Sequence, residues 1–305
     1  MRYDVSIIVI NFHSSTHTLA CVDSIFKHCA NVELKFNIVI VDNDSEGSDY
    51  EKLLPLKAYD NIEIVRSRVN LGFSAGHMFG IQFTQARFYF FLNNDCRFLN
   101  DCLTPLYTFC CEHGNAGVCS PQNYAQDGGI QPTFGYFPTL SSQLLGAGLL
   151  RLFKPEKYPR KKAEYASPLK VDMVQGSALF VRAEAFHRIG GFDTTFFLYC
   201  EEEDLSLRLS KLGYATYLVP EAHNFHYGGG STREVYPAKK EFFISFLYFY
   251  RKHYGLLKTQ ILRLFLFAKH LRRSARAAMN FKLAFFILSG AHLKHSLRHQ
   301  QKMSF

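Results

Sequence analysis

The stretch that decides the fold is Arg87-Phe-Tyr-Phe-Phe-Leu-Asn-Asn-Asp-Cys96. Its apolar run, residues 88–92, is short and uninterrupted, which is typical of a strand buried on both faces of a parallel sheet. Asn93, Asn94 and Asp95 then fall at the carboxyl end of that strand, where open α/β sheets bind ligands. Their oxygens suit Mg²⁺ or Mn²⁺. The alternative is a plain turn and helix cap, because Asn and Asp favour both.

Strands and helices alternate on both sides of this stretch. Apolar, largely β-branched runs predict further strands over 5–10, 36–41 and 62–65. We expect the helix that follows Gly72 to reach about Arg87. About four strand–helix repeats within the first 110 residues indicate right-handed βαβ units. The sequence therefore predicts an α/β fold of Rossmann-like type, with a mostly parallel sheet and flanking helices.

A second polar cluster follows the second predicted strand. Asp42 and Asp44 come directly after it, so we expect them on the same rim of the sheet as Asp95, where an acid can bind a ribose or a base. The chain has no GxGxxG after its first strand and no GxxxxGK[ST], which argues against dinucleotide-binding and P-loop proteins. Gly72 and Gly76 would let the backbone approach a ligand closely.

The alternation stops near residue 120. We expect loops or an irregular hairpin over 122–138 and a basic surface loop over 154–168, and we place substrate specificity in this part of the chain. β structure resumes around Gly176, and a short helix ends at Gly190-Gly191.

Four consecutive acids, Glu201-Glu-Glu-Asp204, open the next predicted helix, whose buried face would carry Leu205, Leu209 and Leu212. The helix dipole favours acids in a first turn, so a purely structural role is one explanation. Four acids exceed what a cap requires, however. Their mutual repulsion is expected to raise the pKa of at least one carboxylate, which suits a general base.

A histidine stands beside a glycine-rich segment near the end of this region. A strand is predicted over 214–219, and His223, His226 and Gly228-Gly-Gly-Ser-Thr232 follow it. A histidine in this position could contact a metal or a phosphate, although most single histidines do neither.

Charge divides the chain at about residue 236. Residues 239–305 hold 14 Lys and Arg against one acid, Glu241, a net charge of +13; because the whole chain carries +9, residues 1–238 carry −4. We predict a body over 1–235 and a basic, aromatic helical tail over 236–305. The tail's apolar runs, the aromatic 242–250 among them, are too short to span a bilayer. We expect the tail to lie on an anionic membrane surface, the alternatives being a helical cap on the body or a nucleic-acid contact.

Cysteine usage and the first residues of the chain indicate the compartment. The eight Cys show no CxxC and no metal-type spacing, and a strand begins almost at the first residue rather than a signal peptide. We therefore expect reduced thiols in a cytosolic protein, with Cys96 in a packing role.

Five motifs follow one another along the chain: Val5-Ser-Ile-Ile-Val-Ile-Asn-Phe12, Val41-Asp-Asn-Asp-Ser45, Asn70-Leu-Gly-Phe-Ser-Ala-Gly76, Leu92-Asn-Asn-Asp95 and Gly190-Gly-Phe-Asp-Thr-Thr-Phe-Phe-Leu-Tyr-Cys-Glu-Glu-Glu-Asp-Leu205. In this order they resemble glycosyltransferase family 2. The likeness covers roughly residues 3–232 and is closest to bacterial rhamnosyltransferase-like members that build surface polysaccharides. It implies a GT-A fold and a sugar transfer that inverts the anomeric centre.

The resemblance also implies roles for single residues. Glu202 matches the family's catalytic base, which is usually Asp, and the longer Glu side chain leaves Glu201 or Glu203 as alternatives. Asp95 would hold the metal on the donor diphosphate, with His226 close to it, although a strict DxD motif begins with Asp where this chain has Asn93. The donor-binding candidates are Asp42, Asp44, Asn70, Gly72, Asn93, Asn94, Gly176 and His226.

The expected activity follows from these roles. A sugar, with rhamnose as the candidate, would move from a dTDP- or UDP-sugar to a lipid-linked or lipopolysaccharide glycan of the O-antigen kind, with Mg²⁺ or Mn²⁺ as cofactor. The protein would be peripheral on the cytoplasmic face of the bacterial inner membrane, with no nucleic acid as partner. The alternatives are a nucleotidyltransferase, although Asn11-Phe-His-Ser-Ser15 lacks its glycine-rich basic signature, an inactive homologue, or a nucleic-acid-binding protein that uses the tail.

Overall fold

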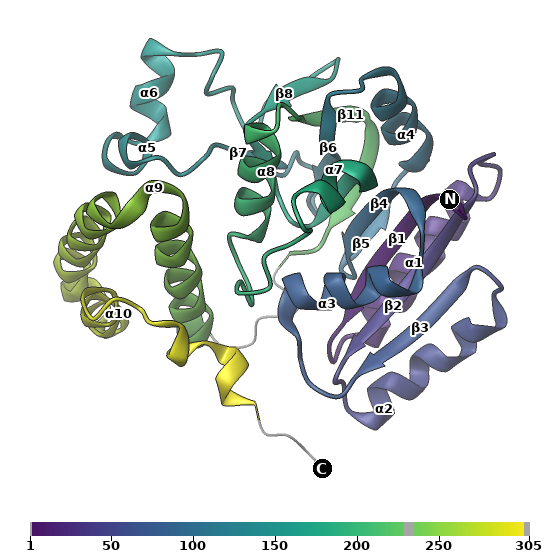
Figure 1. The fold of residues 1–305 in the computed structure, drawn as a ribbon, viewed down its shortest axis with the longest axis horizontal. Helices are drawn as coiled ribbons and strands as arrows, with labels where there is room; N and C mark the ends of the chain where they lie inside the picture. Colours follow the sequence, from purple (N-terminus) through teal and green to yellow (C-terminus); the bar gives the residue numbers. More distant parts are fainter. Residues whose placement is uncertain (1, 229–234, 302–305) are drawn as a thin grey trace. The chain divides into compact units, whose positions relative to one another are not determined.

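The chain forms two compact units. The computed structural model describes residues 2–228 and 235–301, apart from the side chain of Arg276, and Figure 1 shows their path. A nine-stranded sheet lies in unit 1, and the described part of unit 2 contains helices. Unit 1 comprises Met1–Tyr136, Arg160–Thr194 and Glu201–Ser231, and unit 2 comprises Phe137–Pro159, Thr195–Cys200 and Thr232–Phe305.

Four parallel strands form the first half of the sheet in unit 1. Their order is β3 (Ile62–Ser67), β2 (Phe36–Asn43), β1 (Tyr3–Asn11) and β4 (Ala86–Asn93). The register pairs Asn11 with Asp42 and Ile10 with Asn93. Because the strands are parallel, their carboxyl ends meet at one rim, and the polar residues that follow β2 and β4 lie there as predicted.

The second half of the sheet is mixed. Beyond β4 the order is β10, β6, β11 and β5, with β8 also paired to β11. β6 and β11 are parallel, whereas β10 is antiparallel to both of its neighbours and β5 and β8 are antiparallel to β11. The predicted α/β class is confirmed. The bounds are β5 (Cys96–Phe98), β6 (Ala116–Tyr124), β8 (Leu169–Val171), β10 (Ala178–Arg182) and β11 (Ala215–His226), with a separate pair β7 (Phe134–Gly135) and β9 (Met173–Val174).

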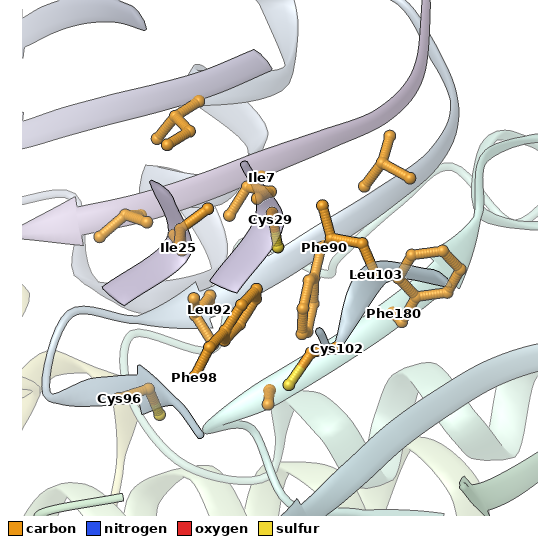
Figure 2. Close-up of a cluster of buried hydrophobic side chains, with 14 of the residues drawn as sticks. Ile7, Ile25, Cys29, Phe90, Leu92, Cys96, Phe98, Cys102, Leu103 and Phe180 are labelled. Atoms are coloured by element: carbon orange, nitrogen blue, oxygen red, sulfur yellow. The ribbon is translucent and has the colours of Figure 1, made fainter. Parts of the chain in front are cut away.

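Two apolar layers hold the helices on the sheet. Successive residues of β1 face opposite sides, so Ile7 belongs to one layer and Ile8 to the other. Figure 2 shows part of the first layer, which contains Ile25 of one helix, Leu103 of another and Phe90 of β4. The first layer packs under α1 (Ser15–Cys29) and α4 (Leu103–Glu112), and the second under α3 (Gly72–Gly80), α7 (Ala183–Arg188) and α8 (Glu201–Lys211). A short helix α2 (Gly47–Tyr50) and a 3-10 helix (Glu51–Ala58) complete this part.

Helix α3 is shorter than predicted. It ends at Gly80, a 3-10 turn follows over Ile81–Phe83, and Ala86 already begins β4, so the expected extension to Arg87 was wrong. Glycine lowers helix stability, which explains the early end. Gly80 also brings α3 close to the sheet, because a Cβ atom there would lie 2.7 Å from Ile8 Cγ2.

Strand β6 occupies residues where the alternation was expected to stop. Its polar side chains hid it, because a buried strand is recognised by apolar residues. Here the structure satisfies those side chains internally: Gln122 Nε2 donates to Thr133 Oγ1 (3.1 Å), and Asn123 Nδ2 donates to Ser177 Oγ (2.9 Å).

Two further expectations need correction. Leu212 was placed on the buried face of the acidic helix, but the helix ends at Lys211 and Leu212 is 46% exposed. His223 and His226 were placed after a strand, but both lie inside β11, whose bulge near Val219 breaks the apolar pattern.

Unit 2 contains α5 (Leu140–Leu145), α6 (Ala147–Phe153), α9 (Val235–Arg273) and α10 (Ala278–Leu288). Gly255, with φ +80°, interrupts α9, so that this long helix bends. α10 packs against α9. Three 3-10 turns follow α9 and α10, at Ser274–Arg276, Leu293–His295 and Leu297–Gln300.

The aromatic run over 242–250 belongs largely to the interior of unit 2. Phe249 and Tyr250 are fully buried, and Phe243 and Phe246 nearly so. These four rings are packed inside protein, whereas Phe242 is 37% exposed, and contact of the tail with a membrane stays a prediction. None of the described helices combines the length and the apolar character needed to cross a bilayer.

Candidate active site

Asp42 is fully buried at the end of β2, inside a hydrogen-bond network. Its Oδ1 accepts a hydrogen bond from Asn11 Nδ2 (2.9 Å), and its Oδ2 accepts one from the Ser45 backbone N–H (3.2 Å). Arg66 Nε lies 3.1 Å from the same Oδ2. These protein donors occupy the carboxylate and hold the loop after β2 in place, and direct contact of Asp42 with a nucleotide stays a prediction.

Asn43 connects this loop to the start of α3. Its Oδ1 accepts from the Leu71 backbone N–H (3.0 Å), and its Nδ2 donates to Asn70 Oδ1 (3.0 Å) and to the Gly72 carbonyl (3.1 Å). Gly72 has φ +73° and Asp44 has φ +67°, the left-handed region in which a non-glycine residue is uncommon. Asn43 thus joins two of the predicted donor-binding residues, Asn70 and Gly72, to the end of β2.

Asn93 and Asn94, at the end of β4, form hydrogen bonds with different parts of unit 1. The Asn93 backbone N–H donates to the Ser177 carbonyl (2.9 Å). Asn94 Nδ2 donates to Ser14 Oγ (2.7 Å) and to Thr18 Oγ1 (2.9 Å). Asn94 therefore fastens the rim to the first turn of α1 as a donor and not as a helix cap, and its contact with a sugar donor stays a prediction.

Asp95 and His226 form the acidic end of this rim. His226 Nε2 lies 3.5 Å from Asp95 Oδ1, and His226 Nδ1 lies 3.0 Å from Gln131 Oε1. Burial acts to raise the pKa of Asp95, but the hydrogen bond from His226 and its charge outweigh burial and hold that pKa below the ordinary value. Asp95 is therefore an anion at neutral pH. Of the adjoining glycine-rich segment, residues 229–232 lie outside the described part of the chain.

The chemistry of this group fits a divalent cation. Asp95, Cys96 and His226 offer ligand atoms that all lie within 4.8 Å of one another. Burial raises the pKa of the Cys96 thiol well above its ordinary value, so the thiol stays protonated and donates to the Ser177 carbonyl (3.3 Å). Cys96 is thus a packing residue, as expected. The carboxylate oxygen and the imidazole nitrogen remain, and Mn²⁺ accepts both, whereas Mg²⁺ favours the oxygen.

The acidic first turn of α8 contains a pair of carboxylates. Burial raises the pKa of Glu202, while hydrogen bonds from Glu203 and from the Gly176 backbone N–H (3.3 Å) act in the opposite direction. Burial and then the charge of Glu202 raise the pKa of Glu203 well above its ordinary value. Glu201 is also buried. Asp204, by contrast, forms an ion pair with Arg208 at 2.7 Å. The pKa rise falls on Glu202 and Glu203, but its largest cause is burial, and the predicted repulsion between the acids contributes second, at Glu203.

One short connection touches both acidic sites. The Gly176 backbone N–H donates to Glu202. The next residue, Ser177, accepts hydrogen bonds through its carbonyl from the backbone of Asn93 and the thiol of Cys96, the neighbour of Asp95. A Cβ atom on Gly176 would lie only 3.5 Å from Glu202 Oε1. The carboxylate pair and the Asp95–His226 pair are therefore linked through this connection, although Asp95 and Glu202 lie more than 100 residues apart in sequence.

Sequence reasoning missed several residues of this site. Asn43 stood in a quoted motif without a role. Arg66 was placed just beyond a strand, but the register sets it directly opposite Asp42. Gln131, which contacts His226, lies in a Gly- and Pro-rich stretch that carries no motif, so no signal in the sequence would have found it.

A sequence model described as glycosyl transferase family 2 matches residues 6–190, more than half of the chain. The chain belongs to glycosyl transferase family 2. The family's description names glycosyl transfer, so the nucleotidyltransferase alternative loses its basis.

Curated relatives point to one branch of the family. The N-acetylglucosaminyl-diphospho-decaprenol L-rhamnosyltransferase of Mycobacterium tuberculosis is 34% identical over 122 residues, 38% of this chain and 39% of that protein. Rhamnosyltransferase WbbL of Escherichia coli K12 is 36% identical over 104 residues, 33% of this chain and 36% of that protein. The hexosyltransferase Agl10 of low-salt glycan biosynthesis in Haloferax volcanii is 24% identical over 213 residues, 68% of this chain and 62% of that protein. The matched part thus spans less than half of either rhamnosyltransferase.

A solved structure supports the fold. The crystal structure of GalNAc-T7 with UDP, GalNAc and Mn²⁺ aligns with a TM-score of 0.57 and 15% identity, over 81% of this chain and 50% of that one. At this identity the likeness concerns the fold alone. The GT-A architecture expected from the sequence motifs is confirmed, with the C-terminal helices α9 and α10 as an addition to it.

Proposed function

We propose that this glycosyltransferase moves a rhamnosyl group from a dTDP- or UDP-sugar to a lipid-linked glycan, with inversion at the anomeric carbon. The observation that carries the proposal is the Gly176–Ser177 connection, which holds a carboxylate pair beside the Asp95–His226 pair. Direct displacement needs a base for the acceptor and positive charge near the leaving diphosphate. Two relatives are named as rhamnosyltransferases, which is the basis for rhamnose as the sugar. The name of the Mycobacterium tuberculosis relative includes a diphospho-decaprenol, which is the basis for a lipid-linked acceptor.

Glu202 is the proposed base. Its carboxylate takes the proton of the acceptor hydroxyl as the hydroxyl oxygen bonds to the anomeric carbon, and the bond from that carbon to the diphosphate oxygen breaks. Because a raised pKa strengthens a base, burial of Glu202 serves this step. Glu203 shares a hydrogen bond with Glu202 and positions it. Glu201 stays the alternative base.

The donor would lie along the rim at the ends of β2 and β4. Asp44, Asn70 and Gly72 would surround the nucleoside, and Asp95 with His226 would hold the divalent ion near the diphosphate. When bound, the ion supplies positive charge that stabilises the departing diphosphate. Gln131 keeps the His226 ring oriented through its Nδ1.

A lipid-linked acceptor would require the enzyme to work at a membrane. We place it as a peripheral protein on the cytoplasmic face of the bacterial inner membrane. The basic composition of residues 239–305 supports this placement, because the cytoplasmic leaflet is anionic.

A donor screen tests the proposal. Purified protein is incubated with UDP-, dTDP- and GDP-sugars and Mg²⁺ or Mn²⁺, and nucleoside diphosphate release and thermal stabilisation are followed. We expect a response to a rhamnosyl donor. Glu202→Gln should keep donor-induced stabilisation and lose about 10²- to 10⁴-fold in turnover, while Glu184→Gln, an exposed acid on α7, should match the wild type. Full activity of Glu202→Gln would remove Glu202 from the role. No response to any donor would indicate an inactive homologue.

A further inference from the structure

Unit 2 carries an exposed apolar face built from two separate segments. Its members are all in helices and lie at 44% exposure or more, with Leu152, Phe153 and Leu257 at 78%, 76% and 75%. We call it the apolar face, and it consists of Leu145, Leu149, Leu152, Phe153, Leu256 and Leu257. Leu149, Leu152 and Phe153 share one side of α6 by their helical spacing. α5 packs against both α6 and α9, and Figure 1 places α5 and α6 on the side of α9 where that helix bends.

The structure fixes this face in position. Thr139 caps α5 by accepting a hydrogen bond from the Ser142 backbone N–H (3.2 Å). Gly146, with φ +80°, sets the turn between α5 and α6. Arg151 Nε donates to the carbonyl of the buried Tyr158 (2.6 Å), which anchors the end of α6. The apolar side chains are therefore presented by folded, capped helices. Free-standing exposed leucines are normal on proteins, but a gathered set of this kind marks a contact surface.

The residues that border the apolar face are mostly cationic. Lys154 follows Phe153, Lys258 follows Leu257, and Lys157 lies three residues beyond Lys154; all three are exposed. Between 140 and 159 the only acid is Glu156, and residues 251–273 contain seven Lys and Arg and no acid. Exposed apolar side chains with cationic neighbours in sequence match the interface of a bilayer with anionic lipid head groups.

We propose that the apolar face is the membrane-docking surface of this enzyme, with Leu152, Phe153 and Leu257 inserted at the level of the lipid head groups. This inference rests on the proposed function in one respect only, namely that the membrane contains the lipid-linked acceptor. A second copy of the chain fits less well, because a symmetric contact would set the same lysines against one another. The docking surface thus differs from the buried aromatic run over 242–250.

Vesicle flotation of the full-length protein tests the proposal. The probes are phosphatidylcholine vesicles with and without phosphatidylglycerol. We expect binding to the anionic vesicles, and the double variant L152Q/F153Q should lower the partition coefficient at least about tenfold. K154Q/K157Q should lower it about tenfold at low salt and less at high salt. The matched control F83Q/L212Q changes two exposed apolar side chains of unit 1 and should bind as the wild type does.

Three results would overturn the proposal. One is equal vesicle binding by L152Q/F153Q and wild type. Another is equal binding to neutral and anionic vesicles. The third is a wild-type dimer in light scattering that L152Q/F153Q converts to a monomer. Donor turnover without membranes is measured on the same samples. If the protein binds vesicles but turns over no donor, the proposed function is contradicted and the docking surface is not. If it turns over a donor but does not bind vesicles, the docking surface is contradicted and the proposed function is not.

Discussion

Replacing Glu203 by Gln should stabilise the folded protein at neutral pH. In the wild type, burial and the neighbouring charge of Glu202 raise the pKa of Glu203 well above its ordinary value of 4.5. A glutamine has nearly the same shape, carries no charge, and keeps an N–H that can donate to Glu202. The substitution therefore removes the free-energy cost of keeping this side chain protonated in the folded state, and it keeps the hydrogen bond.

The size of the effect follows from proton linkage. Above pH 4.5 the unfolded chain has lost the Glu203 proton, whereas the folded chain still holds it because of the raised pKa. The folded state then binds one more proton, so the wild-type free energy of unfolding falls with rising pH by up to about 1.4 kcal/mol per pH unit. The fall ends once the pH passes the folded-state pKa. Glutamine does not titrate, so the variant's advantage is near zero below pH 4.5 and grows with this slope above it.

Urea denaturation between pH 4 and pH 8 measures this difference directly. Wild type, Glu203→Gln and Glu63→Gln are compared at each pH, Glu63 being an exposed acid on β3. Glu63→Gln should follow the wild-type curve. A constant difference between Glu203→Gln and wild type across the whole range would refute the reasoning, because it would mean that Glu203 titrates alike in the folded and unfolded chains.

Three further substitutions probe the rim and the sheet. Asp95→Asn should abolish the Mn²⁺-dependent thermal stabilisation by UDP or dTDP, which in the wild type amounts to about 2.7 kcal/mol at a nucleotide concentration of one hundred Kd; an unchanged shift would count against a metal at this site. Gly80→Ala places a Cβ atom 2.7 Å from Ile8 Cγ2 and should cost about 1–3 kcal/mol in urea denaturation, while Gly47→Ala, with open space around it, should cost less. Asn94→Ala removes the hydrogen bonds to the first turn of α1 and should cost about 1–3 kcal/mol, and wild-type stability in that variant would show that those bonds are dispensable.

Local patterns in the chain were enough for the first half of the fold. The apolar runs predicted β1 to β4 and their parallel direction, because these strands are mostly apolar and, apart from β3 with its exposed Glu63 and Arg66, largely buried. The same pattern put Asp42 and Asp95 at one rim, since the carboxyl ends of parallel strands meet there. Where a strand buries polar side chains, as β6 does with Gln122 and Asn123, the pattern fails.

Contacts between residues far apart in sequence determined the features that local patterns could not predict. Composition could not tell whether the aromatic run over 242–250 contacts lipid or protein, because a bilayer and a protein interior are both apolar. In the folded protein most of these rings are buried, whereas Leu152 and Phe153 are exposed. Glu202 and Asp95 come together only because β10 returns antiparallel to β4 and carries Ser177 to Asn93. That pairing depends on the register between two strands that are 85 residues apart in sequence. The contacts that stabilise this register join distant residues, so a short segment of sequence does not reveal them.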